Sequence, residues 1–274
     1  GTAVNLVASP APRDIYHDVA VRVTELLREM PASTLRDAWL AHGINRKITK
    51  RTTMTLPYGC TRYACSLFVN EDYIMKEQPP EIQPEDYGSA ANFLSHVIWK
   101  ALDDVVVKAR EVMEWLKGWA KHTAAQGLQV TWRAPNGLKV VSEYERMKIV
   151  RVRSVAFKTD IRLYKPEEGK PDLVKIANAV APNFVHSLDA SHLDRVVIRA
   201  TAEGMHPVTI HDDFGVHADD TERFHEIIRE EFVAMYQDST ILEDMAAYSG
   251  YGVPVPALGD LDLQQVLNSP YFFA

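Results

Sequence analysis

The sequence predicts a mainly α fold with a small antiparallel β element, which is an α+β class. Apolar residues recur at spacings of three and four along most of the 274-residue chain, as in helices that pack on one side. One short stretch instead alternates around an Asn-Gly pair, which is typical of a hairpin. A second short β-branched run indicates one more strand near the C-terminal end.

Three helices are expected in the N-terminal part. Asp14 caps the first, whose apolar stripe has helical spacing. The second covers Thr34 to His42, before Gly43, and the third runs through a basic stretch to about Tyr58, where Gly59 stops it. The stripe of the first helix consists of Ile15, Val19, Val23, Leu26, Leu27 and Met30.

A Pro-rich connection, KEQPPEIQPEDYG, precedes one long helix that is expected over about Ala90 to Ala124. The stretch LQVTWRAPNGLKVV then predicts a hairpin with Asn136 and Gly137 in its turn. The apolar residues expected to face one another in this hairpin are Val130, Trp132, Leu138 and Val140.

The C-terminal part alternates between helices and one strand. A helical segment is expected from Gly169 to Gly204 with a break near Pro182. The strand Val208 to Ile210 follows, and then an amphipathic helix from Asp220 to Tyr236. The tail GDLDLQQVLNSPYFFA ends in apolar residues, so we expect it to dock on the protein.

Composition is that of an ordinary globular protein, with 46% hydrophobic residues and a net charge of −7. No apolar run approaches the ~18 residues of a membrane-spanning helix. Two stretches, Asn45 to Arg62 and Lys148 to Lys158, carry basic residues and no acid, which suits a polyanionic substrate held locally. Cys60 and Cys65 lack partners for a zinc site and are interpreted as inert thiols.

Four residues of the basic stretch recur every fourth position and therefore form one ridge on a helix. The ridge presents cations first, then a thioether, then a phenol, which matches the order of phosphates, sugar and base in a nucleoside triphosphate. A solvated basic face is the alternative interpretation. The ridge consists of Arg46, Lys50, Met54 and Tyr58, flanked by Lys47 and Arg51.

Several motifs resemble those of one protein family and occur in the same order along the chain. RKITKRTTMTLPYG resembles the fingers-helix motif of the single-subunit DNA-directed RNA polymerases of bacteriophages and mitochondria. APNFVHSLDASHL resembles the segment that enters the palm of that family, and IHDDFG its second metal-binding palm motif. AVNLVASPAPRDIY, the hairpin and the C-terminal tail also match, so the resemblance covers essentially the whole chain.

The resemblance implies part of a right-hand polymerase fold. Residues 1–12 would end an upstream palm segment, residues 13–185 would form the fingers, and residues 186–274 would form the C-terminal palm segment. The C-terminal Phe273-Ala274 would be a docked foot supporting the palm. The partners implied are a DNA template, nascent RNA and nucleoside triphosphates, without a membrane.

The resemblance also implies a reaction, the transfer of a nucleotide from a nucleoside triphosphate to an RNA 3′ end. The family uses two metal ions, here Mg²⁺. Asp212 would bind the catalytic ion, with Asp213 as a secondary ligand, and His211 would lie beside the growing RNA end. His186 would lie against the minor groove of the nascent pair.

The ridge would bind the incoming nucleotide. By the resemblance, Lys50 and Arg46 would contact the triphosphate, with Arg51 supporting them. Tyr58 would sense the ribose 2′-hydroxyl and stack at the insertion site. Met54 and Gly59 complete the expected substrate-binding set.

The sequence departs from the family pattern at three of these motifs, and in the segment that enters the palm Leu188 replaces a usual Gln and Ala190 a usual Gly. Asp213 stands where the phage enzymes usually carry Ser, and Pro57 where the family commonly has Ala. The family's first palm aspartate belongs upstream of the segment that resembles Ala3 to Leu6. We therefore expect the chain to be a fragment or subunit that needs an upstream polypeptide, acting in the cytoplasm of a phage-infected bacterium in preference to a mitochondrion.

Three other interpretations stay open. A DNA polymerase of the same palm fold is compatible with Tyr58 and Asp213. A non-catalytic accessory subunit could bind nucleic acid with the same basic surfaces. A metal-dependent phosphohydrolase would take its ligands from His186, His192, His211 and Asp212.

Overall fold

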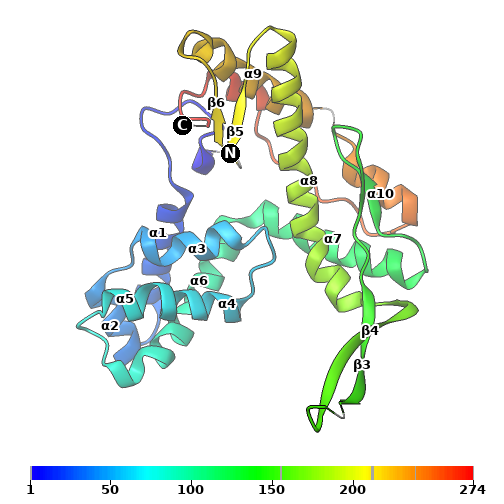
Figure 1. The fold of residues 1–274 in the computed structure, drawn as a ribbon. Coiled ribbons are helices and arrows are strands. Elements are labelled where there is room, and N and C mark those ends of the chain that lie inside the picture. The colour runs from blue at the N-terminus through cyan, green and yellow to red at the C-terminus, as the bar shows by residue number, and fades with distance from the viewer. Residues whose placement is uncertain (1, 155, 211–212, 238, 274) are drawn as a thin grey trace. The chain divides into compact units, whose positions relative to one another are not determined.

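The computed structural model of the chain describes residues 2–154, 156–210, 213–237 and 239–273. These residues form mostly helices, together with three two-stranded antiparallel sheets (Figure 1). The predicted mainly α fold with a small antiparallel β component is therefore confirmed. The chain divides into two compact units, of which unit 1 comprises residues 1–111, 192–239 and 257–274, and unit 2 comprises residues 112–191 and 240–256.

Unit 1 begins with a group of helices whose apolar faces pack together. Helix α1 contacts α3 and α6, and α4 also contacts α6. Trp39 is fully buried among them and donates its indole N–H to the Ala90 carbonyl oxygen at 3.1 Å. The elements are η1 (Thr2–Val4), α1 (Ile15–Glu29), α2 (Thr34–His42), α3 (Arg46–Thr55), α4 (Arg62–Leu67), the π-helix η2 (Phe68–Ile74), α5 (Met75–Glu77), η3 (Pro84–Asp86) and α6 (Tyr87–Val105).

Side-chain caps set the first turns of these helices. Asp14 accepts a hydrogen bond from the Tyr16 N–H and so caps α1, as predicted. Asn45 caps α3 in the same way by accepting from Lys47. Helix α2 has the predicted bounds and ends at Gly43, whose φ of 85° favours glycine.

The prediction of a single long helix over Ala90 to Ala124 is wrong. The structure has two helices, α6 and α7 (Val107–Ala125), separated at Val106, which leaves the helical region at φ −108° and ψ 47°. Three consecutive β-branched residues, Val105 to Val107, occupy this point, and such residues have low helix propensity. The sequence therefore breaks the helix without proline or glycine.

The rest of unit 1 surrounds a second apolar cluster. Val196 and Ile227 are fully buried there, and Leu6 of the N-terminal segment packs against the cluster. The predicted strand and the predicted amphipathic helix are both present, and the strand pairs with a second strand that was not predicted. The elements are the C-terminal part of α8 (Leu173–Ala202), β5 (Val208–Ile210), β6 (Asp213–Gly215), η4 (Ala218–Asp220), α9 (Thr221–Tyr236) and η5 (Leu263–Asn268).

The C-terminal segment docks on this cluster. Phe272 is 5% exposed within it, and the Ser269 hydroxyl donates to the Asn5 carbonyl oxygen at 2.6 Å. The buried guanidinium of Arg229 donates to the Ser269 carbonyl oxygen at 3.1 Å through Nε. Docking of the tail is therefore confirmed through Phe272, whereas Phe273 stays about half exposed and Ala274 lies outside the described residues.

Unit 2 is built around tryptophans that satisfy their indole N–H groups. Trp119 donates to the Met245 carbonyl oxygen at 2.6 Å, and Trp132 donates to the Ser187 hydroxyl at 3.0 Å. The unit combines most of α7 and the first part of α8 with β1 (Thr131–Arg133), β2 (Lys139–Val141), β3 (Glu145–Ser154), β4 (Thr159–Pro171) and α10 (Ile241–Ser249).

Helix α8 continues through Pro182, so the expected break is wrong. Proline removes one backbone donor, but Val180, Ala181 and Phe184 are all buried around it and hold the helix by packing.

The predicted hairpin is present as β1 and β2, with Trp132 opposite Val140. Its pairing differs at the ends, because Val130 accepts from the Ser142 N–H and Leu138 is 63% exposed in the five-residue loop. A second and much longer ribbon, β3 paired with β4, was not predicted (Figure 1).

Candidate functional site

The basic helix α3 turns its cations outward because its other face is buried. Ile48, Thr49, Thr52 and Thr53 face the helix group, and the threonine hydroxyls are all hydrogen-bonded. Thr49 donates to the Tyr16 carbonyl oxygen at 2.7 Å, which ties α3 to α1. Arg46, Lys50, Met54 and Tyr58 are all exposed, so the predicted ridge exists as a surface feature.

Arg46, at the start of the ridge, is held by α1. Its Nε donates to Oδ2 of Asp14 at 2.5 Å, while Oδ1 of the same carboxylate caps α1. The guanidinium also lies 5.1 Å from the centroid of the Tyr16 ring. Arg46 is nevertheless half exposed, which leaves donors accessible to an anion.

Arg51 is held by the π-helix η2. It pairs with Asp72, and its guanidinium carbon lies 4.2 Å from the centroid of the Phe68 ring. Lys76 also bonds Asp72, at 3.2 Å. Partial burial opposes ionisation of Asp72, yet hydrogen bonds from Lys76 and Arg51 hold its pKa below the ordinary value.

Lys50 differs from these neighbours. Lys47 pairs with Glu77 at 3.1 Å, but Lys50 has no ion-pair partner among the residues that the structure describes. It is exposed and lines an open depression of about 340 Å³. The depression is lined by Lys47, Lys50, Arg51, Met54, Asp72, Tyr73 and Glu77. A cation without a fixed partner in a depression is well suited to bind an anion.

The helix ends earlier than expected, at Thr55 instead of about Tyr58. Pro57 has no N–H to continue the ladder of helical hydrogen bonds, and the chain closes a turn in which the backbone N–H of Tyr58 donates to the Thr55 carbonyl oxygen at 3.1 Å. Gly59 has a φ of 84°, which favours glycine at the end of the turn. Tyr58 is 41% exposed there.

The two cysteines lie next to this turn and have the properties expected of inert thiols. Cys65 is fully buried, and burial raises the pKa of its thiol to about 12. Burial also raises the pKa of Cys60 above its ordinary value. Both thiols are free, and because the thiolate is the reactive form, neither is primed for chemistry.

Asp213, the second of the two adjacent aspartates, comes after the strand β5 among the described residues. Ile210 at the end of β5 pairs with Asp213 at the start of β6, where Asp213 is exposed. The predicted site residues His211 and Asp212 lie outside the described residues. Within residues 2–154, 156–210, 213–237 and 239–273, no three His, Cys, Asp or Glu side chains are arranged to hold a metal ion.

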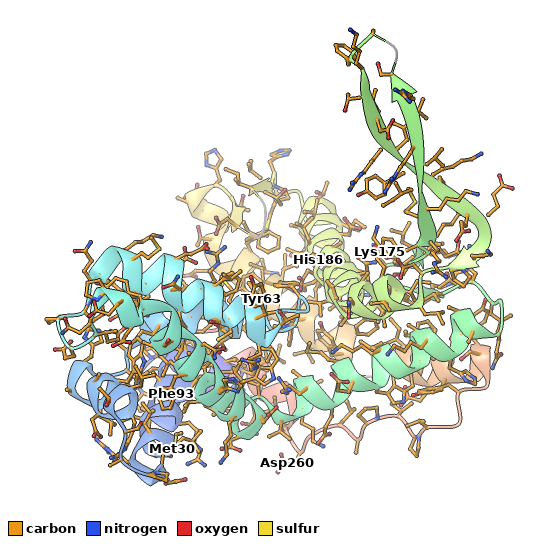
Figure 2. The ribbon with its side chains drawn as sticks, turned by 90° about the horizontal axis from the view of Figure 1, so that it is seen from below. Met30, Tyr63, Phe93, Lys175, His186 and Asp260 are labelled. Carbon is orange, nitrogen blue, oxygen red and sulfur yellow. The ribbon has the colours of Figure 1, made fainter. Side chains whose placement is uncertain are left out.

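The two candidate histidines of α8 have different surroundings. His186 is exposed and lies on the part of α8 that belongs to unit 2, as does Lys175 (Figure 2). His192 is 6% exposed in unit 1 and lies among the rings of Phe214, Phe232 and Phe273. His192 is therefore a core residue.

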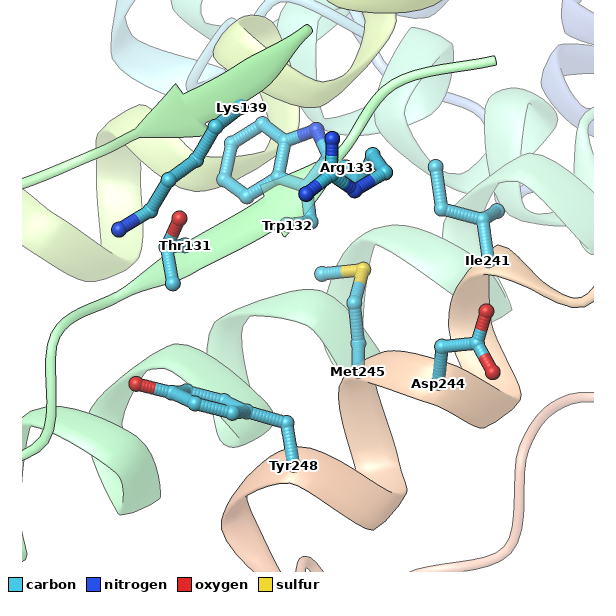
Figure 3. A pocket seen from close by; sticks show the side chains of 8 residues that line it. All are labelled: Thr131, Trp132, Arg133, Lys139, Ile241, Asp244, Met245 and Tyr248. Atoms are coloured by element: carbon cyan, nitrogen blue, oxygen red, sulfur yellow. The ribbon is translucent and has the colours of Figure 1, made fainter. Parts of the chain in front are cut away.

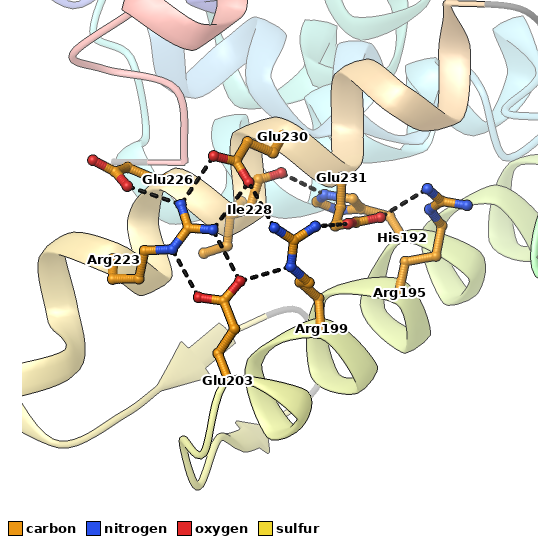
Figure 4. A network of polar contacts seen from close by, with 9 residues as sticks. All are labelled: His192, Arg195, Arg199, Glu203, Arg223, Glu226, Ile228, Glu230 and Glu231. Atoms are coloured by element: carbon orange, nitrogen blue, oxygen red, sulfur yellow. Dashed lines mark hydrogen bonds and ion pairs between the residues drawn. The ribbon is translucent and has the colours of Figure 1, made fainter.

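An ion-pair network joins α8 and α9 beside this core (Figure 4). Arg223 and Arg199 both donate to Glu203, and their hydrogen bonds lower the pKa of that carboxyl to about 2. Glu230 joins the same pair of arginines. The side chains of Arg199, Glu203, Arg223 and Glu230 are between 29% and 45% exposed, so water screens these ion pairs and their contribution to stability is small.

The ribbon β3–β4 places like charges opposite one another. Arg151 faces Arg162, and Lys148 faces Lys165. Like charges directly opposite on a sheet repel, so both pairs destabilise the isolated ribbon. An anion between the strands would relieve that repulsion. The sequence indicated the basic character here but not the pairing.

A separate pocket of about 230 Å³ lies in unit 2 and contains no predicted site residue (Figure 3). Arg133 and Lys139 come from the two strands of the short hairpin, and Asp244 and Tyr248 from α10. Arg133 donates to Gly137 and Lys139 to Gln129, so both cations are already engaged locally.

Sequence comparison identifies relatives over nearly the whole chain. The model of one protein family, described as DNA-dependent RNA polymerase, matches residues 1–250. A mitochondrial DNA-directed RNA polymerase 1 of Nicotiana sylvestris is 32% identical over 284 residues, covering 99% of this chain and 28% of the relative. The mitochondrial DNA-directed RNA polymerase of Mus musculus is 30% identical over 298 residues, covering 99% of this chain and 24% of the relative.

A shorter relative is matched more completely. DNA-directed RNA polymerase 2A of Nicotiana tabacum is 31% identical over 285 residues, which is 99% of this chain and 84% of that protein. By contrast, the chain spans about a quarter of the length of the two mitochondrial relatives. In the part of the chain that the structure describes, no helix is long and apolar enough to cross a membrane.

Proposed function

The chain belongs to the DNA-dependent RNA polymerase family, and we propose that it forms the fingers and the C-terminal palm portion of such an enzyme. Residues 1–12 would end an upstream palm segment, residues 13–185 would form the fingers, and residues 186–274 the palm segment with its foot. The reaction is template-directed transfer of a nucleotide from a nucleoside triphosphate to an RNA 3′ end. The observation that carries this proposal is Lys50, exposed in the depression beside Arg51 and without an ion-pair partner among the described residues.

The ridge on α3 would bind the incoming nucleotide. Lys50 would act as a compact charge for the triphosphate, and Arg46 and Arg51 would offer planar donors on either side. Each contact gains on the order of 4 kcal/mol before desolvation at an effective dielectric near 20. Tyr58 would contact the ribose 2′-hydroxyl, which its exposed position at the end of the turn permits.

Other exposed groups would contact nucleic acid. The like-charged pairs of β3–β4 suit the phosphates of the template duplex, because an anion offsets their repulsion. His186, exposed on α8, would lie against the nascent pair, and His211 beside the RNA end. Partners of this kind are consistent with the names of the relatives.

The carboxylates after β5 fit Mg²⁺ chemically, because hard oxygen ligands are what this ion prefers and Asp213 is exposed at the strand start. Asp212 would hold the catalytic ion and Asp213 would be secondary. Bound Mg²⁺ would stabilise charge on the reacting phosphate oxygens. The role of the chain's own residues is to orient that carboxylate from a strand end.

A further polymerase segment would complete the palm. Val208 and Ile210 of β5 are both more than 60% exposed, although an apolar strand of this kind is normally covered. The mitochondrial relatives are about four times longer, which is consistent with an additional segment that supplies another metal-binding carboxylate. Their names favour an organelle as the location, instead of the phage-infected bacterium that the sequence predicted.

The test is nucleotide incorporation on a primed DNA template by the complete polymerase. Lys50→Ala should raise the apparent KM for nucleoside triphosphates at least about tenfold, since the substitution removes one charge-assisted hydrogen bond. Lys100→Ala, an exposed lysine of α6, is the matched control and should leave KM unchanged. An unchanged KM in Lys50→Ala would refute the assignment of the ridge. Preference for deoxyribonucleotides in the parent enzyme would favour a DNA polymerase.

A further inference from the structure

The guanidinium of Arg51 is held on two sides by one element. Asp72 accepts its hydrogen bond and Phe68 lies under its plane, and both come from the π-helix η2. Within the described part of the chain, Asp72 is the only hydrogen-bond partner of this guanidinium. Because a guanidinium has five donors, most of them remain open toward the depression that Lys50 lines.

Element η2 is itself anchored to the start of α3. The hydroxyl of Tyr73, the residue after Asp72, accepts from the Asn45 side chain at 2.8 Å and lies 2.8 Å from His42 Nε2. Asn45 is the N-cap of α3, and Tyr73 is 5% exposed. The carboxylate of Asp72 therefore projects from a fixed element, as a group that orients another side chain should.

An arginine side chain without these two contacts would bind a phosphate group less favourably. Unrestrained, its side chain samples many rotamers and gives up about 2 kcal/mol of rotamer entropy on binding. Stacking on Phe68 and pairing with Asp72 remove much of that freedom before a ligand arrives. The same carboxylate bonds Lys76, so the acid is satisfied without using the remaining donors of Arg51.

We propose that Asp72 is a positioning residue for the nucleoside triphosphate, acting through Arg51. It fixes the guanidinium on Phe68 so that the open donors face phosphate oxygens beside Lys50. This inference rests on the proposed function of the ridge. It concerns a residue that no motif in the sequence marked, since Asp72 lies in the acidic region after the basic stretch.

If Asp72 opposed nucleotide binding, its removal would change KM in the opposite direction. If Asp72 competed with the triphosphate for Arg51, removing its charge would tighten nucleotide binding. If Asp72 only stabilised the fold, its removal would lower the melting temperature without a selective change in KM. The three roles therefore predict different kinetics for one substitution.

The experiment measures KM and kcat for nucleoside triphosphates in the complete polymerase. Asp72→Ala should raise KM about three- to tenfold and change kcat by less than about twofold. Asp72→Asn, which keeps the side-chain volume, should behave similarly, and Asp72→Glu should bring KM part of the way back. Lys76→Ala, which removes the other partner of the carboxylate, is the control and should leave KM within about twofold.

A double-mutant cycle identifies the route of the effect. In an Arg51→Ala background, Asp72→Ala should add almost nothing to KM, since it acts through the missing side chain. Additive effects, a lower KM, or a lower melting temperature alone would each overturn the inference. Lys50→Ala separates the two proposals: if it raises KM while Asp72→Ala does not, the ridge binds nucleotide and only the role of Asp72 is wrong. If neither changes KM, the proposed function itself fails.

Discussion

Nε2 of His192 lies 2.9 Å from the carbonyl oxygen of Ile228. The histidine belongs to α8 and the carbonyl to α9, so this contact joins the two helices that enclose the second apolar cluster of unit 1. A histidine used in this way cannot also present the same nitrogen to a metal. Because the His192 ring is also only 6% exposed, the phosphohydrolase interpretation, which needed this residue as a ligand, loses one of its four groups.

We expect His192→Ala to lower the free energy of unfolding by about 2–4 kcal/mol, because the substitution removes both a buried ring and its hydrogen bond. Thermal denaturation measures the effect. Addition of Mn²⁺ or Zn²⁺ should not raise the melting temperature of the parent protein through binding to His192. Metal-dependent stabilisation that disappears in His192→Ala would instead restore the hydrolase interpretation.

Tyr58→Phe should relax discrimination between ribo- and deoxyribonucleotides and leave polymerisation largely intact. One hydroxyl hydrogen bond contributes about 0.5–1.5 kcal/mol, which corresponds to up to about tenfold in discrimination. The measurement is the ratio of kcat/KM for the two substrate classes. Tyr63→Phe removes a hydroxyl from an exposed tyrosine of α4 and is the matched control. Equal discrimination in parent and Tyr58→Phe would contradict the role.

Removing the like-charged pair Arg151 and Arg162 should weaken DNA binding and reduce its salt dependence. For every phosphate that the protein no longer neutralises, the slope of log K against log salt becomes shallower by about 0.9. Because the pair is also repulsive, the double substitution to Gln should leave the fold unharmed. Binding titrations at several salt concentrations measure the slope, and an unchanged slope would show that the ribbon does not bind the phosphates.

Stability should fall when the pH drops below about 6.5. Burial and the neighbouring Arg229 charge lower the pKa of His225 from its ordinary value of 6.5. Between that lowered pKa and 6.5 the unfolded chain binds more protons than the folded chain, so the free energy of unfolding decreases as the pH falls there and is at its full value above 6.5. Melting temperatures between about pH 7.5 and pH 5.5 test this. His225→Gln should flatten this part of the profile, and an unaltered profile would assign the effect elsewhere.

Asp212→Asn should abolish nucleotide addition while template binding survives, whereas Asp213→Ser should be mild. Asp212 is proposed to hold the catalytic ion and Asp213 to be secondary, so only the first substitution should remove an essential ligand. Single-turnover incorporation measures the reaction and a gel-shift assay measures template binding. Comparable inactivation of both variants would end the proposed division of labour.

Local signals predicted the helices of unit 1 well where caps and stops coincide with helical spacing. Helix α2 has the predicted bounds because Gly43 ends it, and α1 begins after Asp14 because that side chain caps it. Such signals act within one turn of the chain, so a single sequence contains them in full. The ridge on α3 followed from the same periodicity.

Features that depend on distant partners could not be predicted in this way. The ion pair of Arg51 with Asp72 joins residues 21 positions apart across two helices. The ribbon β3–β4 alternates apolar and basic residues in part, as from Val150 to Arg153, but both of its faces are mostly exposed, so this alternation did not reflect a half-buried strand. Pro182 stays helical because packing outweighs its missing donor.

The hydrogen bond between Ser269 and Asn5 has a consequence for synthesis on the ribosome. It joins residues 264 positions apart, and Leu6 and Phe272 pack on the same cluster. A contact between residues so far apart in the sequence forms only after the whole intervening chain has been translated. The helices α1 to α6 can fold as they emerge, but the cluster around Val196 must wait for the segment that contains Ser269 and Phe272. We therefore expect nascent chains to expose this cluster to chaperones until that segment has left the ribosome.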